Sequence, residues 1–85
     1  MNCFVYIIGS ESDSRVGNFR IFQTYVGWTT DLNNRLKAHN LGKGAKSTRG
    51  RQWRLLYAER YNNRSEAMSR EWYLKRDRKF RRGLE

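Results

Sequence analysis

The sequence predicts a small α+β fold, in which helices flank a three-stranded antiparallel sheet in the order ββαβα. Three observations lead to this expectation. Runs rich in β-branched and aromatic residues recur at 3–8, 20–26 and 53–61, and polar or glycine-containing segments separate them. Helical patterns follow the second and third runs, at 31–39 and 66–79. A chain of 85 residues has room for one such domain with a modest core.

The first predicted strand, residues 3–8 (CFVYII), is apolar on both faces. We therefore expect it to lie in the centre of the sheet, covered on both sides. Gly9-Ser10 is expected to end this strand, and residues 9–19 to form a polar connecting loop. The second strand, residues 20–26, is expected to stop at Gly27 and to pair antiparallel with the first.

The first predicted helix, residues 31–39, begins after Thr29 or Thr30 as its N-terminal cap and ends near Gly42. Its expected buried pair is Leu32 and Leu36.

The third predicted strand, residues 53–61, is followed by a turn at Asn62-Asn63. Ser65 is the predicted cap of the last helix, with Glu66 in its first turn. One face of the third strand is expected to carry Leu55, Tyr57 and Glu59. The residues of the last helix expected to pack inward are Ala67, Met68, Trp72 and Phe80. The same reasoning places Cys3, Trp53 and Trp72 in the core rather than on the surface.

The net charge of the chain is +10, and its distribution is uneven. Residues 43–82 hold fourteen basic and four acidic side chains, whereas residues 1–42 hold four and three. Arg outnumbers Lys by thirteen to five, which favours bidentate contacts with phosphate. The asymmetry favours a nucleic acid as the partner, with an anionic membrane or an unspecific basic surface as the alternative.

The segment 41–52 (LGKGAKSTRGRQ) is glycine-rich and basic. It is expected to be too polar to bury and suited to hold phosphates with backbone N–H groups and cations. The predicted nucleic-acid contacts in it are Lys43, Lys46, Thr48, Arg49 and Arg51. A second basic band either joins these contacts or is a solvated face, and it comprises Arg76, Lys79, Arg81 and Arg82.

Several classes of protein are disfavoured by the composition. No apolar run approaches the length of a membrane span, and no signal-like segment is expected at the N-terminus. The single cysteine, Cys3, can form no internal disulfide, which fits the reducing cytoplasm. One Cys and one His are too few for a structural zinc site.

Three polar side chains are expected to face one volume beside the end of the second strand. Tyr25 lies at the strand end, and Arg35 and His39 lie four residues apart on the first helix, hence on one face. Core packing does not require this combination, so it indicates a functional site.

These residues resemble the pattern of the GIY-YIG nuclease family. The first family motif reads here Phe4-Val5-Tyr6, with Phe in place of its glycine, and the second reads Tyr25-Val26-Gly27. The family arginine on the first helix, ten residues after the second tyrosine, is matched by Arg35. The tyrosine or histidine one turn later is matched by His39, and the glutamate of the last helix by Glu71.

The resemblance covers almost the whole chain and identifies residues 1–85 as a single domain of this kind. It looks closest to the small bacterial single-domain branch, through the stretch from Tyr25 to Thr48. Two departures stand out. Trp28 occupies the position of a lysine found in some members, and the asparagine that some members carry beyond the glutamate has no clear match.

The resemblance implies a catalytic set of Tyr6, Tyr25, Arg35, His39 and Glu71. Tyr6 accepts a proton from the attacking water if nearby positive charge lowers its pKa, and Tyr25 orients the water or binds the scissile phosphate. The sequence does not decide which tyrosine is the base. Arg35 neutralises transition-state charge, and His39 relays a proton from Tyr6 or contacts the leaving group.

Each of these residues also has a structural interpretation. Tyr6 is alternatively a core aromatic, and Arg35 a surface side chain that flanks the buried stripe. His39 is alternatively a cation at a helix C-terminus. Glu71 is alternatively the partner of Lys75 in an i,i+4 ion pair on a solvated face.

Together, the residues and the resemblance predict a metal-dependent endonuclease that hydrolyses DNA in repair or DNA processing. Glu71 is the expected ligand of a single Mg²⁺ or Mn²⁺, because such ions take one or two protein carboxylates besides water and phosphate. RNA is not excluded as substrate, and a protein partner is a candidate source of specificity. The alternative is a non-catalytic nucleic-acid-binding module that retains the nuclease fold.

Overall fold

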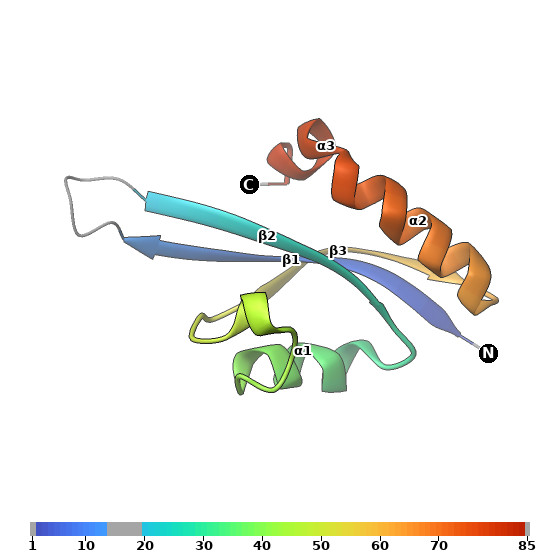
Figure 1. The fold of residues 1–85 in the computed structure, drawn as a ribbon, viewed down its shortest axis with the longest axis horizontal. Coiled ribbons are helices and arrows are strands. Elements are labelled where there is room, and N and C mark those ends of the chain that lie inside the picture. Colours follow the sequence, from blue (N-terminus) through green and yellow to red (C-terminus); the bar gives the residue numbers. More distant parts are fainter. Residues whose placement is uncertain (1, 14–19, 85) are drawn as a thin grey trace.

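The computed structural model describes residues 2–13 and 20–84 of the chain. It confirms the predicted α+β fold, with a three-stranded antiparallel sheet in the spatial order β2-β1-β3 (Figure 1). The elements in chain order are β1 (Cys3–Asp13), β2 (Arg20–Thr29), α1 (Leu32–Asn40), the 3₁₀ turn η1 (Lys46–Thr48), β3 (Arg54–Tyr61), α2 (Arg64–Arg76) and α3 (Arg78–Arg82).

The sheet separates two layers. The α1 helix and η1 lie on one face, and α2 and α3 lie on the other (Figure 1). The core on the α1 face contains Tyr6, Ile8 and Trp53, with Tyr25, Leu32 and Leu36 packed against them. The core on the α2 face contains Cys3, Val5, Ile7, Val26, Ala67 and Leu74. The central position of β1, predicted from its two apolar faces, is therefore confirmed, as are the burial of Cys3 and Trp53.

Both first strands continue past the glycines that were predicted to end them. β1 runs through Gly9 to Asp13, and β2 runs through Gly27 to Thr29. These glycines serve close packing rather than turning. A Cβ on Gly9 would lie 2.6 Å from Leu56 Cδ1, so a side chain there would collide with the neighbouring strand. The rest of the predicted loop, residues 14–19, lies outside the described residues.

The helix caps also differ from the prediction. Asp31, not Thr29 or Thr30, caps α1, and its carboxylate accepts a hydrogen bond of 3.1 Å from Asn34 N. Asn63, not Ser65, caps α2 by accepting 2.8 Å from Glu66 N. In both helices the cap is the residue whose side chain accepts a hydrogen bond from the backbone N–H of the third helical residue. The α1 end agrees with prediction, since Gly42 has φ 77° and donates to His39 O.

The last helical segment is broken in two, and it extends beyond the predicted bounds of 66–79 at both ends, from Arg64 to Arg82. α2 ends at Arg76, and Asp77 starts the separate helix α3 by capping Phe80 N at 3.0 Å. Ala67 and Leu74 face the sheet, whereas Met68 is 46% and Trp72 is 51% exposed. The prediction of Met68 and Trp72 as inward residues was therefore wrong. Phe80 does pack inward, edge-on to Tyr57.

The third strand begins at Arg54, one residue later than predicted, and carries an irregularity opposite Ile7 and Ile8. Ile7 pairs with Tyr57 while Ile8 pairs with Leu55, so Leu56 is an extra residue in the ladder. Leu56 then packs on the α2-face core together with Tyr57, and Leu55 is 45% exposed. The bulge breaks the simple alternation that had placed Leu55 beside Tyr57.

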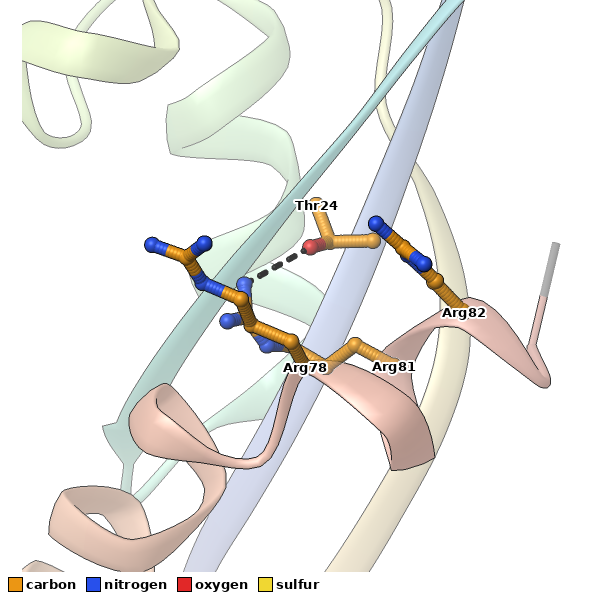
Figure 2. Close-up of a pocket in the computed structure, with 4 residues that line it drawn as sticks. All are labelled: Thr24, Arg78, Arg81 and Arg82. Atoms are coloured by element: carbon orange, nitrogen blue, oxygen red, sulfur yellow. Dashed lines mark hydrogen bonds between the residues drawn. The ribbon is translucent and has the colours of Figure 1, made fainter.

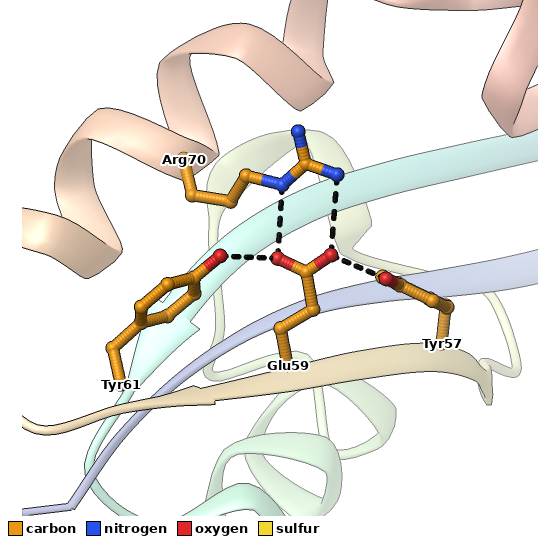
Figure 3. Close-up of polar contacts among 4 residues, drawn as sticks. All are labelled: Tyr57, Glu59, Tyr61 and Arg70. Carbon is orange, nitrogen blue, oxygen red and sulfur yellow. Dashed lines mark hydrogen bonds and ion pairs between the residues drawn. The ribbon is translucent and has the colours of Figure 1, made fainter.

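A polar cluster, the Glu59 cluster, ties β3 to α2 (Figure 3). Arg70 donates from Nε and Nη2 to the two Glu59 oxygens at 2.9 and 3.2 Å. Tyr61 donates to Oε1 at 2.6 Å, and Tyr57 donates to Oε2. Burial raises the pKa of Glu59, but the hydrogen bonds from Arg70, Tyr57 and Tyr61 outweigh it and lower the pKa to about 2.

Candidate active site

A chain of buried polar groups crosses the α1 face of the sheet, and we call it the relay chain. Tyr6, His39 and Thr48 are its members, and all three are almost fully buried. Tyr6 Oη lies 2.8 Å from His39 Nε2, and His39 Nδ1 lies 2.8 Å from Thr48 Oγ1. Tyr6 comes from β1, His39 from the last turn of α1, and Thr48 from η1. Three separate elements thus place one continuous hydrogen-bonded line.

The hydrogen bonds fix where the protons of the relay chain reside. Thr48 Oγ1 donates to Ala45 O at 2.8 Å, so its own proton is used and it accepts from His39. His39 therefore carries its proton on Nδ1, and its Nε2 is left as an acceptor when the ring is neutral. The Tyr6 hydroxyl then donates to His39 Nε2. The line runs in one direction, from Tyr6 through His39 to Thr48.

The electrostatic setting favours neutral members. Burial, and after it the charge of Arg35, lower the pKa of His39 below its ordinary value, so the imidazole is neutral at neutral pH. This contradicts the alternative of a helix-terminal cation. Burial raises the pKa of Tyr6 although Arg35 opposes the shift. Arg35 does lower the Tyr6 pKa, as the condition for a Tyr6 base required, but burial is the larger influence and the net pKa is raised, so the phenol is protonated until a neighbour accepts its proton.

Arg35 completes the arrangement from the middle of α1. Its Nε donates to Tyr6 Oη at 3.3 Å, so the hydroxyl oxygen accepts from Arg35 while donating to His39. Tyr25 closes the group, with its ring centroid 5.0 Å from that of His39 and 6.4 Å from that of Tyr6. The structure thus brings together Tyr6, Tyr25, Arg35 and His39, as their positions in the sequence predicted.

Within the described residues, no carboxylate pairs with Arg35. The hydrogen bond to Tyr6 is the largest influence on the pKa of Arg35 and raises it, so the charged guanidinium is stabilised. In the part of the chain that the structure describes, the hydrogen-bond partners of this half-buried guanidinium are phenol groups, so it keeps donors for an anion. The α1 face therefore presents a cation beside a proton acceptor, a combination suited to phosphate chemistry.

Two glycines make room for the relay chain. A Cβ on Gly27 would lie 2.5 Å from Tyr6 Oη, so the phenol of Tyr6 can extend across β2 only because position 27 has no side chain. A Cβ on Gly44 would lie 2.3 Å from His39 Nδ1. Gly27 is thus explained by the close approach of Tyr6 and Gly44 by that of His39, and neither is explained by backbone strain.

Glu71 approaches from the other layer, on α2. Its carboxylate pairs with Lys75 Nζ at 3.0 Å and is 20% exposed, so the predicted i,i+4 ion pair is present. The pair does not involve any of the four residues on the α1 face. After burial, Arg35 and Tyr25, the charge of Glu71 also influences the pKa of Tyr6 and raises it, which places the carboxylate within electrostatic reach of that phenol.

The basic segment after α1 is only partly as predicted. Lys43, Lys46 and Arg49 are exposed, whereas Arg51 is half-buried with its Nε 3.3 Å from Ser10 Oγ. Thr48 is fully buried, so its side chain is not available to a nucleic acid and instead orients His39. The expectation that the whole segment is too polar to bury was wrong at this residue, because its hydroxyl finds two partners.

Sequence reasoning missed the support for His39. The signal was present in the stretch HNLGKGAKST, where small residues allow the chain to fold back over the helix end. Asn40 fixes the same region, since its amide donates to Trp53 O at 3.0 Å and accepts from Trp53 N at 2.6 Å. Trp53 Nε1 donates to Thr48 O at 2.8 Å. Together these polar residues hold the histidine ring in place.

Residues 2–84 match the GIY-YIG catalytic domain. The chain belongs to the GIY-YIG family. It is 45% identical over 74 residues to a UPF0213 protein of Clostridium perfringens, a match that covers 86% of this chain and 70% of that protein. It is 50% identical over 56 residues to a UPF0213 protein of Streptococcus pneumoniae, covering 65% and 57% respectively. A solution NMR structure of a UPF0213 protein from Bacillus halodurans is 37% identical, with a TM-score of 0.49 and coverage of 99% and 82%.

Two further findings bear on the surroundings of a site. Over residues 2–13 and 20–84, no helix is long and apolar enough to cross a membrane. In the same part of the chain, no three His, Cys, Asp or Glu side chains gather into a group that could hold a metal ion.

Proposed function

We propose that this GIY-YIG domain, residues 1–85, is a metal-dependent endonuclease that hydrolyses phosphodiester bonds in DNA. One observation carries the proposal, the hydrogen bonding around Tyr6. The buried Tyr6 hydroxyl donates a hydrogen bond to Nε2 of His39. Arg35, which has no carboxylate partner in the described chain, donates to the same tyrosine oxygen. A purely structural cluster has no need for an uncompensated cation next to a proton acceptor. The family match supports the same class of reaction.

The relay chain supplies the general base. Tyr6 Oη accepts a proton from the attacking water while its own proton passes to His39 Nε2. His39 then becomes an imidazolium that keeps its Nδ1–H on Thr48 Oγ1. Because burial raises the pKa of Tyr6, transfer to His39 in the same step avoids a free phenolate. Tyr6 rather than Tyr25 is therefore the base in this proposal.

The remaining α1-face residues act on the phosphate. Arg35 turns its free guanidinium nitrogens to the non-bridging oxygens, where negative charge grows in the transition state. Tyr25 lies beside His39 at the strand edge and orients the water or the phosphate with its hydroxyl. The water oxygen forms a bond to phosphorus as the bond to the leaving oxygen breaks, and solvent water protonates the leaving oxygen.

Glu71 fits a divalent cation by its donor chemistry. It is a single carboxylate that already attracts a cation, Lys75, and Mg²⁺ commonly takes one or two carboxylates and several waters. When bound, Mg²⁺ or Mn²⁺ supplies Lewis-acid stabilisation of charge on the phosphate and leaving oxygens. Glu71 holds the ion in this proposal, and its pair with Lys75 opens to do so.

Exposed lysines and arginines of the segment after α1 hold the strand on either side of the cleaved bond. Lys43, Lys46 and Arg49 extend away from the core and carry this role, with Arg51 beside them. RNA is an alternative substrate within the same proposal, because the proposed steps act on the phosphate and not on the sugar. A partner protein is the proposed source of any selectivity for sequence or structure.

The proposal is tested by cleavage of end-labelled single-stranded, duplex and branched DNA, and of RNA of equal length, with Mg²⁺ or Mn²⁺. Wild type is compared with Glu71→Gln and with Glu66→Gln, an exposed glutamate of the same helix. We expect metal-dependent cutting that Glu71→Gln reduces by about 10²–10³-fold and Glu66→Gln leaves unchanged. Binding without metal-dependent cutting of any substrate would instead identify a nucleic-acid-binding module.

A further inference from the structure

A second cationic site lies on the opposite face of the sheet from the relay chain. A hollow of about 170 Å³, the α3 pocket, is lined by Thr24 of β2 and by Arg78, Arg81 and Arg82 of α3. Figure 2 shows the arginine side chains reaching from α3 toward β2, where Thr24 lies. The three arginines that α3 places around this pocket are not explained by the proposed chemistry at Tyr6.

Arg81 is held in place before any ligand arrives. Its Nη1 donates to Thr24 Oγ1 at 3.2 Å, and its Nη2 donates to Lys75 O at 2.9 Å. Its Nε is buried and, within the described part of the chain, has no hydrogen-bond partner. The two hydrogen bonds therefore fix the guanidinium of Arg81, and its charge, beside the pocket. The fixed guanidinium is a preorganised part of a binding site.

The charges of the α3 pocket point to an anion. Three arginines line it, and no carboxylate is among its lining residues. The nearby acid, Asp77, is occupied as the cap of Phe80 N. Arginines that line one pocket repel one another until an anion compensates their charge. The planar N–H donors of a guanidinium group also match the spacing of phosphate oxygens. The ligand chemistry is therefore that of a phosphate group.

The position of the pocket connects it to the proposed cleavage site. Thr24 and Tyr25 are neighbours in β2, and because side chains alternate along a strand, Thr24 faces α3 while Tyr25 faces α1. β2 is an edge strand of the sheet. A nucleic-acid strand that crosses this edge contacts Arg35 on one face and the α3 pocket on the other.

We propose that the α3 pocket binds a backbone phosphate of the nucleic-acid substrate, so that the substrate wraps around the β2 edge. This inference rests on the proposed function for the class of ligand, but it concerns binding and does not depend on hydrolysis. Arg78 and Arg82, both exposed, supply the contacts, and Arg81 contributes its positive charge, which its hydrogen bonds to Thr24 and Lys75 hold beside the pocket.

The test compares two variants that each lose two positive charges. Arg78→Gln/Arg82→Gln empties the pocket of its exposed arginines and leaves Arg81 to hold α3 in place. Arg54→Gln/Arg60→Gln changes two exposed residues of β3 that do not line the pocket and belong to neither basic band. Affinity for one labelled DNA is measured in EDTA over a series of salt concentrations, so that cutting does not enter. Circular dichroism checks that both variants are folded.

We expect the pocket variant to bind about tenfold more weakly than the control variant. Its plot of log affinity against log salt should be shallower by about 0.7–0.9 for each phosphate that the variant no longer neutralises. In wild type, inorganic phosphate should shift the NMR signals of Arg81 Nε–H and the Thr24 amide, and it should not do so in the pocket variant.

Equal losses of affinity in the two variants would overturn the inference, because net charge alone would then explain binding. Phosphate shifts in wild type without a difference in DNA affinity would also overturn it, since the pocket would then take a free anion only. Both outcomes are independent of cleavage. A wild type that binds through the pocket and never cuts would refute the proposed hydrolysis and leave the pocket assignment standing.

Discussion

The two faces of the sheet carry polar clusters of similar composition and opposite electrostatic character. On the α2 face, Glu59 receives hydrogen bonds from Arg70, Tyr57 and Tyr61, so one carboxylate and one guanidinium neutralise each other. On the α1 face, Arg35 and Tyr6 meet a neutral histidine, and the described residues supply no anion. A cluster that is balanced within the chain holds the fold together. A cluster with an uncompensated positive charge favours the binding of an anion.

The same contrast appears in the direction of the hydrogen bonds. In the Glu59 cluster every bond ends on the carboxylate, and proton movement would only weaken it. In the relay chain the bonds follow one another from Tyr6 to His39 to Thr48, and a proton can move along them. Convergence on one acceptor therefore indicates stability, and a directed line indicates proton transfer.

The largest expected effect comes from the cation of the α1 face. Arg35→Lys keeps the charge but loses the fork that donates to Tyr6 and to phosphate at once. We expect the cleavage rate to fall by about 10²–10³-fold while the free energy of unfolding changes by less than about 1 kcal/mol. Arg70→Lys is the matched change on the α2 face, and it should reduce stability and leave the cleavage rate of the folded protein near that of wild type. Single-turnover cleavage and urea unfolding measure the two quantities.

Substitution of Glu59 should reduce the stability of the fold rather than the cleavage rate. Glu59→Gln removes the charge that holds Arg70 and two phenols, and we expect the free energy of unfolding at pH 7 to fall by about 1–3 kcal/mol. The upper part of this range is reduced because Arg70 is 37% exposed. The pKa of Glu59 is about 2 in the folded chain against an ordinary 4.5. Its stabilisation is therefore complete above pH 4.5 and is lost as the pH falls toward 2.

Urea unfolding at several pH values checks this window. The difference in stability between wild type and Glu59→Gln should shrink as the pH is lowered from 5 to 2. A constant difference over that range would show that Glu59 does not stabilise the fold through its charge.

A smaller effect is expected from the pH dependence of cleavage. His39 accepts a proton only while it is neutral, and its pKa lies below the ordinary value of 6.5 because of burial and the charge of Arg35. Cleavage should therefore persist below pH 6.5 and decline only at more acidic pH. A pH–rate profile under single-turnover conditions measures this limb, and His39→Gln should lack it. A decline that begins well above pH 6.5 in wild type would exclude a neutral His39 as the acceptor.

Much of the fold could be predicted from the sequence because periodicity reports on which faces are buried. The strong apolar runs indicated the central place of β1, and the spacing of Arg35 and His39 put them on one helix face. Position-specific packing was not visible in the same way. Gly9 and Gly27 look like strand ends in sequence, whereas in space they make room for Leu56 and Tyr6. The bulge at Leu56 and the exposure of Trp72 likewise depend on contacts between distant elements.

The members of the candidate site could be named from the sequence, whereas their burial and hydrogen bonds could not. The resemblance to the family named Tyr6, Tyr25, Arg35, His39 and Glu71, and the structure gathers the first four. The raised pKa of Tyr6 follows from its burial, which no local pattern encodes. Thr48 appeared to be a surface residue of a basic segment, and its place next to His39 arises only when Gly44 lets that segment fold over the helix end.

In this proposal the cluster of Tyr6, His39 and Arg35 carries the proton transfer, and the Glu59 cluster stabilises the fold. Tyr6→Phe and Tyr57→Phe test it most directly, because each removes one phenolic hydroxyl from one cluster. Cleavage of the best DNA substrate is measured for both at a temperature where both are folded. We expect the cleavage rate to fall by about 10²-fold or more for Tyr6→Phe and to stay near that of wild type for Tyr57→Phe. Equal losses in the two variants, or a Tyr6→Phe protein that cuts at the wild-type rate, would contradict it.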